Sequence, residues 1–141
     1  MGPGEEERAL NMSVAAYCRV STDREDQVNS LHSQQTYFRD YIRGHGDWTL
    51  AEVYADEGTS GTSTRRREAF NRMIRDAGAG RFQLILTKEV SRFARNTVDA
   101  LEYTRRLKGL GVGVIFINDG IDTRDNDGEL RLTLMASMAQ E

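Results

Sequence analysis

Short apolar runs alternate along the chain with segments in which apolar residues recur every three or four positions. The short runs predict buried strands at 13–20, 48–55, 82–87 and 112–118. The longer spacing predicts helices at 31–43, 67–77, 96–110 and 128–141. This order predicts an α/β fold in three layers, with a mostly parallel central sheet and helices on both faces.

Polar segments connect the predicted elements. Residues 22–30 and the acidic stretch 119–127 predict loops, while Gly, Ser and Thr dominate 56–64 and predict a mobile loop. Residues 1–11 lack apolar periodicity and predict a disordered leader. Because the chain has 141 residues, we expect one α/β domain over 12–127, followed by the final helix.

The final predicted helix is apolar on two sides. One side carries Leu130, Leu134 and Met138, and the other carries Leu132, Met135, Ala136 and Ala139. Such a helix needs two surfaces to pack against, so it is either central to the monomer or also meets another subunit. Its C-terminal place and its methionines, which suit surfaces that repack, favour contact with another subunit.

A serine stands among arginines at the end of the first predicted strand. Arg19 and Ser21 are two residues apart, so in a strand they point to the same side. Arg92 and Arg95 follow the third strand, and parallel strands bring their carboxyl ends to one edge of the sheet. Guanidinium groups match phosphate oxygens and do not act as bases, which favours serine attack on a phosphodiester over attack on an acyl group.

Each of these residues also has a simpler interpretation. Serine is common as a turn or helix cap at strand ends, and Arg92 with Arg95 could be a solvated surface pair. In the run from Arg65 to Arg67, only one arginine need be functional. Gln34 falls on the apolar face of its helix, where it is either a buried group with a satisfied partner or a hydrogen-bond donor of the site.

The distribution of charge adds support for a polyanionic partner. The formal net charge is −3, but residues 61–110 carry 12 basic and 5 acidic side chains. Such asymmetry is typical of proteins that bind polyanions. A genome rich in G and C would also raise the arginine count, so the placement of arginines beside the serine carries more weight than their number.

Other classes of function find little support. The single cysteine, Cys18, excludes an internal disulfide and favours a reducing compartment. No apolar run is long enough for a membrane span, and no signal peptide is evident. The spacing of His32, His45 and Cys18 does not suit zinc, and the aspartates of 119–127 fit a solvated turn. We expect no metal and no cofactor.

Together, these residues resemble the serine recombinase family of resolvases, invertases and large serine integrases or transposases. The resemblance rests on ordered motifs over the whole chain: Tyr17-x-Arg19-Val20-Ser21, Ser30-Leu31-x-x-Gln34, Asp56-x-Gly58-x-Ser60-Gly61 and Ser91-Arg92-Phe93-x-Arg95-Asn96-Thr97. The segment from Asn118 to Thr123 and the tail from Met135 to Glu141 also fit. The family also has an arginine between the mobile loop and the next helix. Arg67 fits that position best, and Arg66 is the alternative. The fold expected from the resemblance is a resolvase-like sandwich ending in a long helix.

The resemblance implies a mechanism and partners. Ser21 would attack double-stranded DNA to form a 5′-phosphoserine link, assisted by Arg19, Gln34, Arg67, Arg92 and Arg95. Subunits would act as dimers that form a tetramer, and 3′-hydroxyl groups would then rejoin the strands without metal. The helix from 128 to 141 would begin a long oligomerisation helix, with the DNA-binding region absent from this chain. An isolated fragment would then cleave poorly, and the protein would be cytoplasmic, encoded by a bacterium or phage.

Two other hypotheses remain open on the sequence alone. One is a non-catalytic module in which the arginines only bind phosphate or nucleic acid. The other is a phosphatase that acts on small phosphate esters through a phosphoserine, which the lack of a recognisable general acid disfavours.

Overall fold

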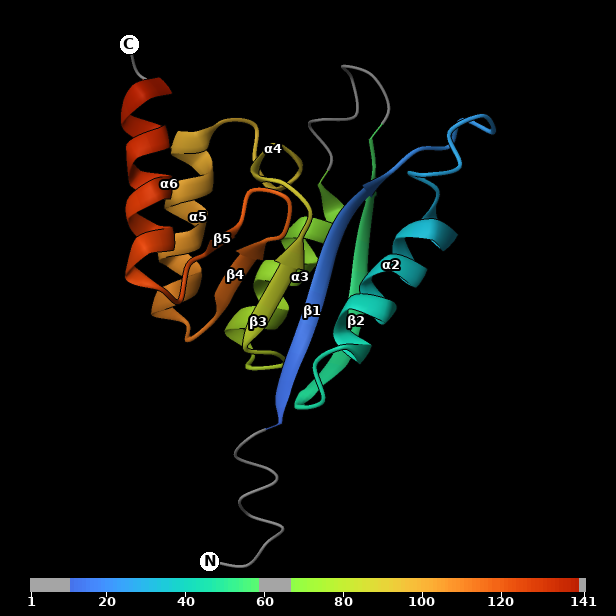
Figure 1. The fold of residues 1–141 in the computed structure, drawn as a ribbon, viewed down its shortest axis with the longest axis horizontal. Coiled ribbons are helices and arrows are strands. Elements are labelled where there is room, and N and C mark those ends of the chain that lie inside the picture. The colour runs from blue at the N-terminus through green and yellow to red at the C-terminus, as the bar shows by residue number, and fades with distance from the viewer. Residues whose placement is uncertain (1–10, 59–66, 140–141) are drawn as a thin grey trace, which may run out of the picture.

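The computed structural model describes residues 11–58 and 67–139, and its strands form one sheet in the order β2-β1-β3-β4-β5 (Figure 1). The strands are β1 (Met12–Val20), β2 (Trp48–Glu57), β3 (Leu84–Thr87), β4 (Gly113–Phe116) and β5 (Ile121–Asp122). Pairing is parallel from β2 to β4, and β5 runs antiparallel to β4. The predicted mostly parallel sheet is therefore confirmed.

Helices cover both faces of this sheet (Figure 1). They are α2 (Leu31–Arg43), α3 (Glu68–Gly78), α4 (Val90–Phe93), α5 (Thr97–Gly109) and α6 (Asn126–Ala139). Successive side chains of β1 point to opposite faces. Ala15 and Tyr17 therefore join a core formed with α3, α4, α5 and α6, while Val14 and Ala16 join a second core beneath α2. This confirms the predicted three layers.

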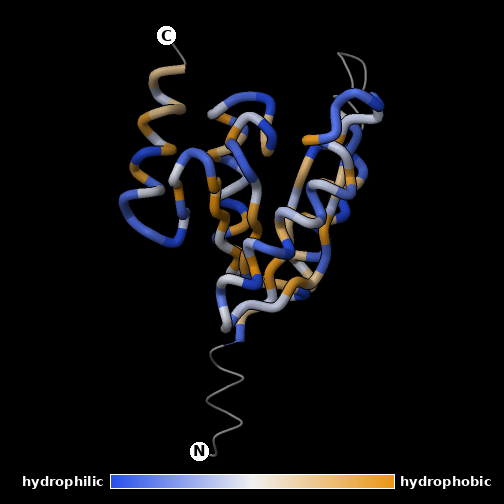
Figure 2. Tube along the Cα trace, turned by 45° about the vertical axis from the view of Figure 1, so that its right-hand side comes forward, coloured by the Kyte–Doolittle hydropathy of each residue, from blue (hydrophilic) through white to orange (hydrophobic). Residues whose placement is uncertain are grey.

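Apolar residues line the strands through the middle of the molecule, whereas hydrophilic residues dominate the loops beyond their ends (Figure 2). Strand residues such as Ile85 and Val114 are fully buried. The parallel strands are thus apolar on both sides, as expected of a sheet covered by helices on both faces. No helix in the described ranges has the length and apolar character needed to span a membrane.

Side chains fix where several helices begin. The Ser30 hydroxyl accepts a hydrogen bond from the Ser33 amide at the start of α2, and the Asn96 side chain does the same for Asp99 in α5. Arg67 precedes α3 without forming such a cap. Instead the carboxylate of Asp56, at the end of β2, accepts hydrogen bonds from the amides of Ala69 and Phe70. This long-range cap ties α3 to the sheet.

The structure differs from the sequence prediction in two short elements. The stretch 119–127, predicted as a loop, contains β5, and the short helix α4 directly follows β3. Thr123 explains the position of β5, because its hydroxyl accepts from the Val114 amide and its own amide donates to the Val114 carbonyl. A strand of two residues in an acidic segment has too little apolar alternation to be predicted.

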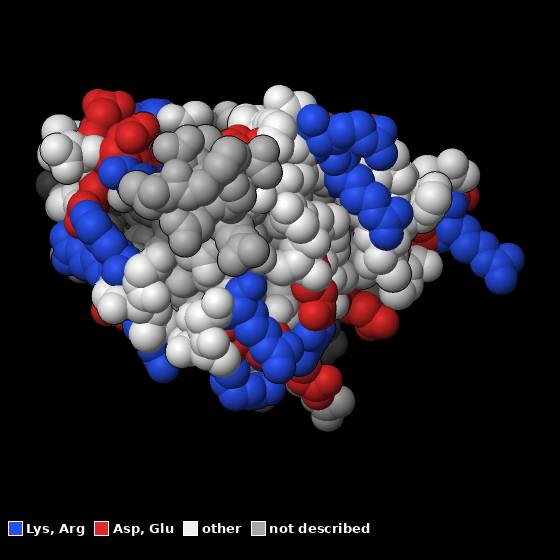
Figure 3. All heavy atoms as spheres, turned by 90° about the horizontal axis from the view of Figure 1, so that it is seen from below, with Lys and Arg blue, Asp and Glu red and all other residues white. Residues whose placement is uncertain are grey.

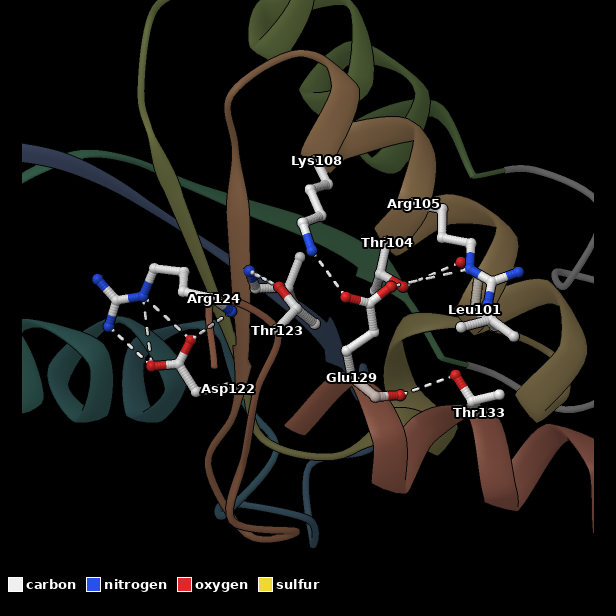
Figure 4. Close-up of polar contacts among 10 residues, drawn as sticks. Leu101, Thr104, Arg105, Lys108, Asp122, Thr123, Arg124, Glu129 and Thr133 are labelled. Carbon is white, nitrogen blue, oxygen red and sulfur yellow. Dashed lines mark hydrogen bonds and ion pairs between the residues drawn. The ribbon is translucent and has the colours of Figure 1, made fainter. Parts of the chain in front are cut away.

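The last helix begins at Asn126, two residues before the predicted start, and packs beside α5 (Figure 1). Glu129 joins the two helices, since it accepts a hydrogen bond from Lys108 at 2.7 Å and lies 4.0 Å from Arg105 (Figure 4). A Cβ atom on Gly128 would overlap the carbonyl group of Asp122, so the close approach of α6 to β5 requires glycine.

The two apolar sides of α6 have different environments. Leu132 and Ala136 are buried against the rest of the molecule, while Leu130, Leu134 and Met138 are 57%, 54% and 74% exposed. The helix is therefore not central to the monomer over its whole circumference.

Several predicted features lie outside the described residues. They are residues 1–10 of the leader, residues 59–66, which include part of the mobile loop and both Arg65 and Arg66, and the last two residues.

Candidate active site

A pocket of about 230 Å³ opens at the carboxyl ends of β1, β3 and β4. Its lining includes three of the residues singled out in the sequence, Arg19, Gln34 and Arg92. They come from β1, α2 and α4, three elements that are far apart along the chain. The remaining lining residues are Tyr17, Cys18, Val28, Asn29, Thr87, Lys88, Glu89 and Asn118.

Two buried polar atoms at this pocket lack a partner. Gln34 is 3% exposed; its amide nitrogen donates to the side-chain oxygen of Asn29 at 3.3 Å. Its Oε1 atom and the Thr87 hydroxyl are buried and have no hydrogen-bond partner among the described residues. An unsatisfied buried polar group costs about 1–3 kcal/mol, so this lining is suited to a polar occupant of the pocket.

Ser21 lies at the rim of the pocket rather than in its lining. It is half-buried, and its amide donates to the carbonyl of Asn29, which does line the pocket. Its hydroxyl accepts a hydrogen bond from the Asp23 amide at 3.1 Å, a local turn of the kind that serine often forms. The turn-cap interpretation of Ser21 thus holds in this structure, with the hydroxyl oxygen as the acceptor.

Asp26 is an acidic neighbour of Ser21 that the sequence analysis did not single out. Hydrogen bonds from the side chain and backbone of Asn29 hold the pKa of the Asp26 carboxyl below its usual value, and the positive charge of Arg92 and the Ser21 hydroxyl lower it further. The Asp26 carboxylate therefore interacts with both the Ser21 hydroxyl and the Arg92 guanidinium at the rim of the pocket.

Arg67 is held apart from the pocket lining. Its guanidinium stacks over the Phe70 ring with 3.6 Å to the ring centre, and it donates a hydrogen bond to the Phe93 carbonyl. The same guanidinium lies 5.5 Å from the ring centre of Tyr17, whose hydroxyl donates to Asp56 at 2.7 Å. Burial raises the pKa of Tyr17, so this phenol stays neutral. Arg67 thus reaches the site only through Tyr17.

Arg95 points to a different place. It lines a second pocket of about 330 Å³ between α4, α5 and α6, together with Asn96 and Met135. Its side chain is 86% exposed, and its nearest carboxylate, Asp99, is 3.9 Å away. The structure therefore brings Arg19, Gln34 and Arg92 together with Ser21 at the rim, and it leaves Arg67 and Arg95 outside that group.

Sequence reasoning did not single out Lys88 and Glu89, and it gave Asn118 only as part of the family resemblance, although the same edge rule points to Lys88 and Asn118. Lys88 directly follows β3, and the Asn118 amide, two residues after β4, donates to the Lys88 carbonyl. The rule that functional groups follow the carboxyl ends of parallel strands could have found both. Cys18 adds no charge to the pocket, because burial raises the pKa of its thiol to about 12.

The basic block seen in the sequence is largely dispersed or paired. Arg72 pairs with Glu52, Arg81 with Asp76, and Lys108 with Glu129. Where the face shown in Figure 3 is not hidden by grey atoms, basic and acidic side chains are interspersed. The count of charges over 61–110 was therefore a weaker guide to the site than the positions of individual arginines. In the described ranges, His, Cys, Asp and Glu form no group of three suited to a metal ion.

Comparison with known proteins identifies the family of this chain. Residues 14–141 match the family described as "Resolvase, N terminal domain". The chain belongs to the resolvase family. Among its relatives, the Tn3 transposon resolvase of Escherichia coli is 27% identical over 129 residues, which are 92% of this chain and 63% of the relative. The R46 site-specific recombinase of Escherichia coli is 28% identical over 92% of this chain and 61% of the relative.

Solved structures of this resolvase family share the fold. The N-terminal catalytic domain of TP901-1 integrase matches with a TM-score of 0.77 and 28% identity over 91% of this chain and 94% of that chain. A resolvase family site-specific recombinase from Streptococcus pneumoniae matches with a TM-score of 0.75 and 32% identity, over 92% and 89%. The chain spans less than two thirds of the length of these two curated relatives.

Proposed function

We propose that the protein carries out site-specific DNA recombination, with Ser21 as the nucleophile that cleaves a DNA phosphodiester. Membership of the resolvase family supports the reaction class. The observation that carries the proposal is the convergence of Arg19, Gln34 and Arg92 on one pocket, with Ser21 at its rim. Guanidinium groups and an amide can donate hydrogen bonds to phosphate oxygens, but they cannot act as the base that acyl transfer needs.

In the proposed reaction, the Ser21 oxygen bonds to phosphorus, and the bond from phosphorus to the 3′ oxygen breaks. The serine proton is lost, the departing 3′ oxygen gains a proton, and a 5′-phosphoserine remains. Negative charge grows on the equatorial phosphate oxygens, where fixed cations stabilise it. The 3′-hydroxyl of a new partner strand then attacks the phosphoserine, which regenerates the serine. The energy of the broken bond is kept in the ester, so the cycle needs no external energy source.

Arg67 and Arg95 enter this proposal as residues that engage DNA when it binds. Arg95 can reorient at small cost, because its side chain is exposed and its one ion pair is long. Arg67 instead contacts Tyr17 and Phe70, in the first turn of α3, outside the pocket lining. We assign it a positioning role in the unbound state, and its direct contact with phosphate would require a change at α3.

The proposed partners are double-stranded DNA and further copies of this chain. The exposed side of α6, formed by Leu130, Leu134 and Met138, supports assembly into a dimer and then a tetramer, as expected of the family. Reaction on chromosomal or phage DNA would place the protein in the cytoplasm. A phosphate-binding module without catalysis is the competing function, since it would use the same arginines.

The test uses the full-length protein and a duplex that carries its recombination site with a nick near the cleavage position. The nick lets the released strand diffuse away and so traps the cleaved state. A denaturing gel, run after reaction in EDTA, should show protein linked to the 5′ end, and Ser21→Ala should remove that adduct. Binding of the site by wild-type protein without any adduct would contradict the proposal and favour the non-catalytic module.

A further inference from the structure

Lys88 is a cation of the pocket that no sequence motif singled out. It directly follows β3, and its side chain is half-buried in the pocket lining. Hydrogen bonds hold its backbone in place, since the Asn118 amide donates to its carbonyl at 2.8 Å and the Ile117 amide donates to that of Thr87 at 2.9 Å. The ammonium therefore extends from a rigid part of the sheet.

The charge of Lys88 is not neutralised within the described part of the chain. Each ion pair formed there by a lysine involves Lys108, and none involves Lys88. The nearest acidic lining residue, Glu89, instead accepts hydrogen bonds from Asn118 and Ser91, both at 3.3 Å. A half-buried ammonium without a paired carboxylate, beside two guanidinium groups of the same lining, makes the pocket suited to an anion.

An aromatic ring holds this ammonium in place. The Lys88 nitrogen lies 4.4 Å from the ring centre of Tyr37, which is within range of a cation–π interaction. Tyr37 comes from α2, the helix that also supplies Gln34. Its ring is itself packed against Phe38 and Tyr41, with ring centres 5.2 Å and 6.4 Å away. Tyr37 thus restricts the lysine side chain without neutralising its charge.

We infer that Lys88 binds a non-bridging oxygen of the DNA phosphate that enters the pocket, and that Tyr37 positions its ammonium for this contact. The inference rests on the proposed function and adds to it a third cation beside Arg19 and Arg92. The three cations come from the ends of β1 and β3 and from α4, so they approach one phosphate from different sides. This arrangement would spread charge stabilisation over the equatorial oxygens.

The first experiment measures the single-turnover rate of adduct formation on nicked DNA. Lys88→Met removes the charge and keeps the length of the side chain, and we expect the rate to fall about 10- to 100-fold, as for a lost hydrogen bond to a charged group. Lys108→Met is the matched control, because Lys108 is exposed and pairs with Glu129 far from the pocket. A rate for Lys88→Met equal to that of Lys108→Met would overturn the inference.

The second experiment tests the role of Tyr37 with the same assay. Tyr37→Phe keeps the ring and should retain nearly the wild-type rate, whereas Tyr37→Leu should lose much of the rate that Lys88→Met loses. Tyr41→Leu is the control for packing, because it removes a neighbouring ring of α2 that does not lie over Lys88. Equal rates for Tyr37→Leu and Tyr41→Leu would show that Tyr37 does not position the lysine.

A third readout separates this inference from the proposed function. In a Ser21→Ala background, the affinity for site DNA is measured against salt concentration. If Lys88 contacts a phosphate, Lys88→Met should lower the logarithmic salt slope by about 1, which loss of folding or packing would not do. An unchanged slope would contradict the lysine contact even if the wild-type protein cleaves DNA. A changed slope without any wild-type adduct would instead contradict cleavage and leave the lysine contact standing.

Discussion

Lys88 and Lys108 show how differently the same side chain is used in two regions of this molecule. At the junction of α5 and α6, Lys108 and Arg105 both pair with the carboxylate of Glu129 at the surface (Figure 4). At the pocket, Lys88, Arg19 and Arg92 converge, and none forms an ion pair within the described residues. The comparison teaches that pairing, and not the number of cations, distinguishes a structural cluster from a site for an anion.

The largest effect expected from this comparison is on cleavage. Arg92→Gln removes a guanidinium from the pocket and should lower the rate of adduct formation about 10²- to 10³-fold, as for loss of a group that stabilises a charged transition state. Arg105→Gln removes a guanidinium from the α5–α6 junction and should leave the rate nearly unchanged. The nicked-duplex assay measures the rate of adduct formation for both variants. Similar losses of rate would show that the arginine in the pocket has no larger role in cleavage than one at the α5–α6 junction.

The next effect concerns the carboxylate that ties the sheet to α3. Asp56→Ala removes the acceptor for the amides of Ala69 and Phe70 and leaves the buried Tyr17 hydroxyl unpaired. Loss of a helix cap and of a buried partner should together lower the free energy of unfolding by roughly 2–4 kcal/mol. Urea denaturation at neutral pH measures it. Surface substitutions usually change the free energy of unfolding by less than about 0.5 kcal/mol. A change that small for Asp56→Ala would contradict this role.

The two sides of α6 give a comparison within one helix. Leu132→Ala empties a fully buried position and should cost about 2–5 kcal/mol in unfolding free energy. Leu134→Ala changes a side chain that is 54% exposed, so it should cost little in the monomer and weaken any assembly of subunits. Urea denaturation at several protein concentrations, together with sedimentation, separates the two effects. A large loss for Leu134→Ala at the lowest concentration would show that this side is covered within the monomer.

The smallest effect should come from the paired region. Hydrogen bonding to Lys108 lowers the pKa of Glu129 below its usual value. A carboxyl with a depressed pKa in the folded state stabilises the fold above its unfolded pKa, and that contribution is lost as the pH falls through the folded pKa. Glu129→Gln should therefore flatten the loss of stability in acid slightly, and added salt should remove the difference. A difference that persists in high salt would contradict an exposed, screened pair.

Much of the fold followed from periodicity, because most strands are short apolar runs and the helices α2, α3 and α5 each carry an apolar stripe. The misses were local. The start of α3 depends on Asp56, twelve residues before the first residue of the helix, and β5 depends on Thr123 pairing with Val114. Such long-range hydrogen bonds leave no periodic signal in the sequence.

The candidate site was predictable where residues directly follow strands of the sheet. Ser21 directly follows β1 and was found for this reason, and Arg92 was found because it lies a few residues after β3. Arg19 lies within β1 and was found by its two-residue spacing from Ser21. Lys88 directly follows β3 and could have been found by the same edge rule. The stacking of Arg67 on Phe70 and the outward direction of Arg95 were not predictable, because they depend on side-chain packing around α3 and α4. Resemblance to a family selected Arg67 from its run of arginines, whereas Arg95 was found with Arg92 after the third predicted strand. The contact of both arginines with DNA stays a prediction.

The central claim is that Ser21 becomes covalently bonded to DNA at the rim of the pocket. The most direct measurement isolates the adduct from nicked site DNA, digests the protein with protease and the DNA with nuclease, and identifies the modified peptide by mass spectrometry. The account predicts a nucleotide joined through its 5′ phosphate to Ser21. A nucleotide on any other residue, or an adduct that persists in Ser21→Ala, would contradict it.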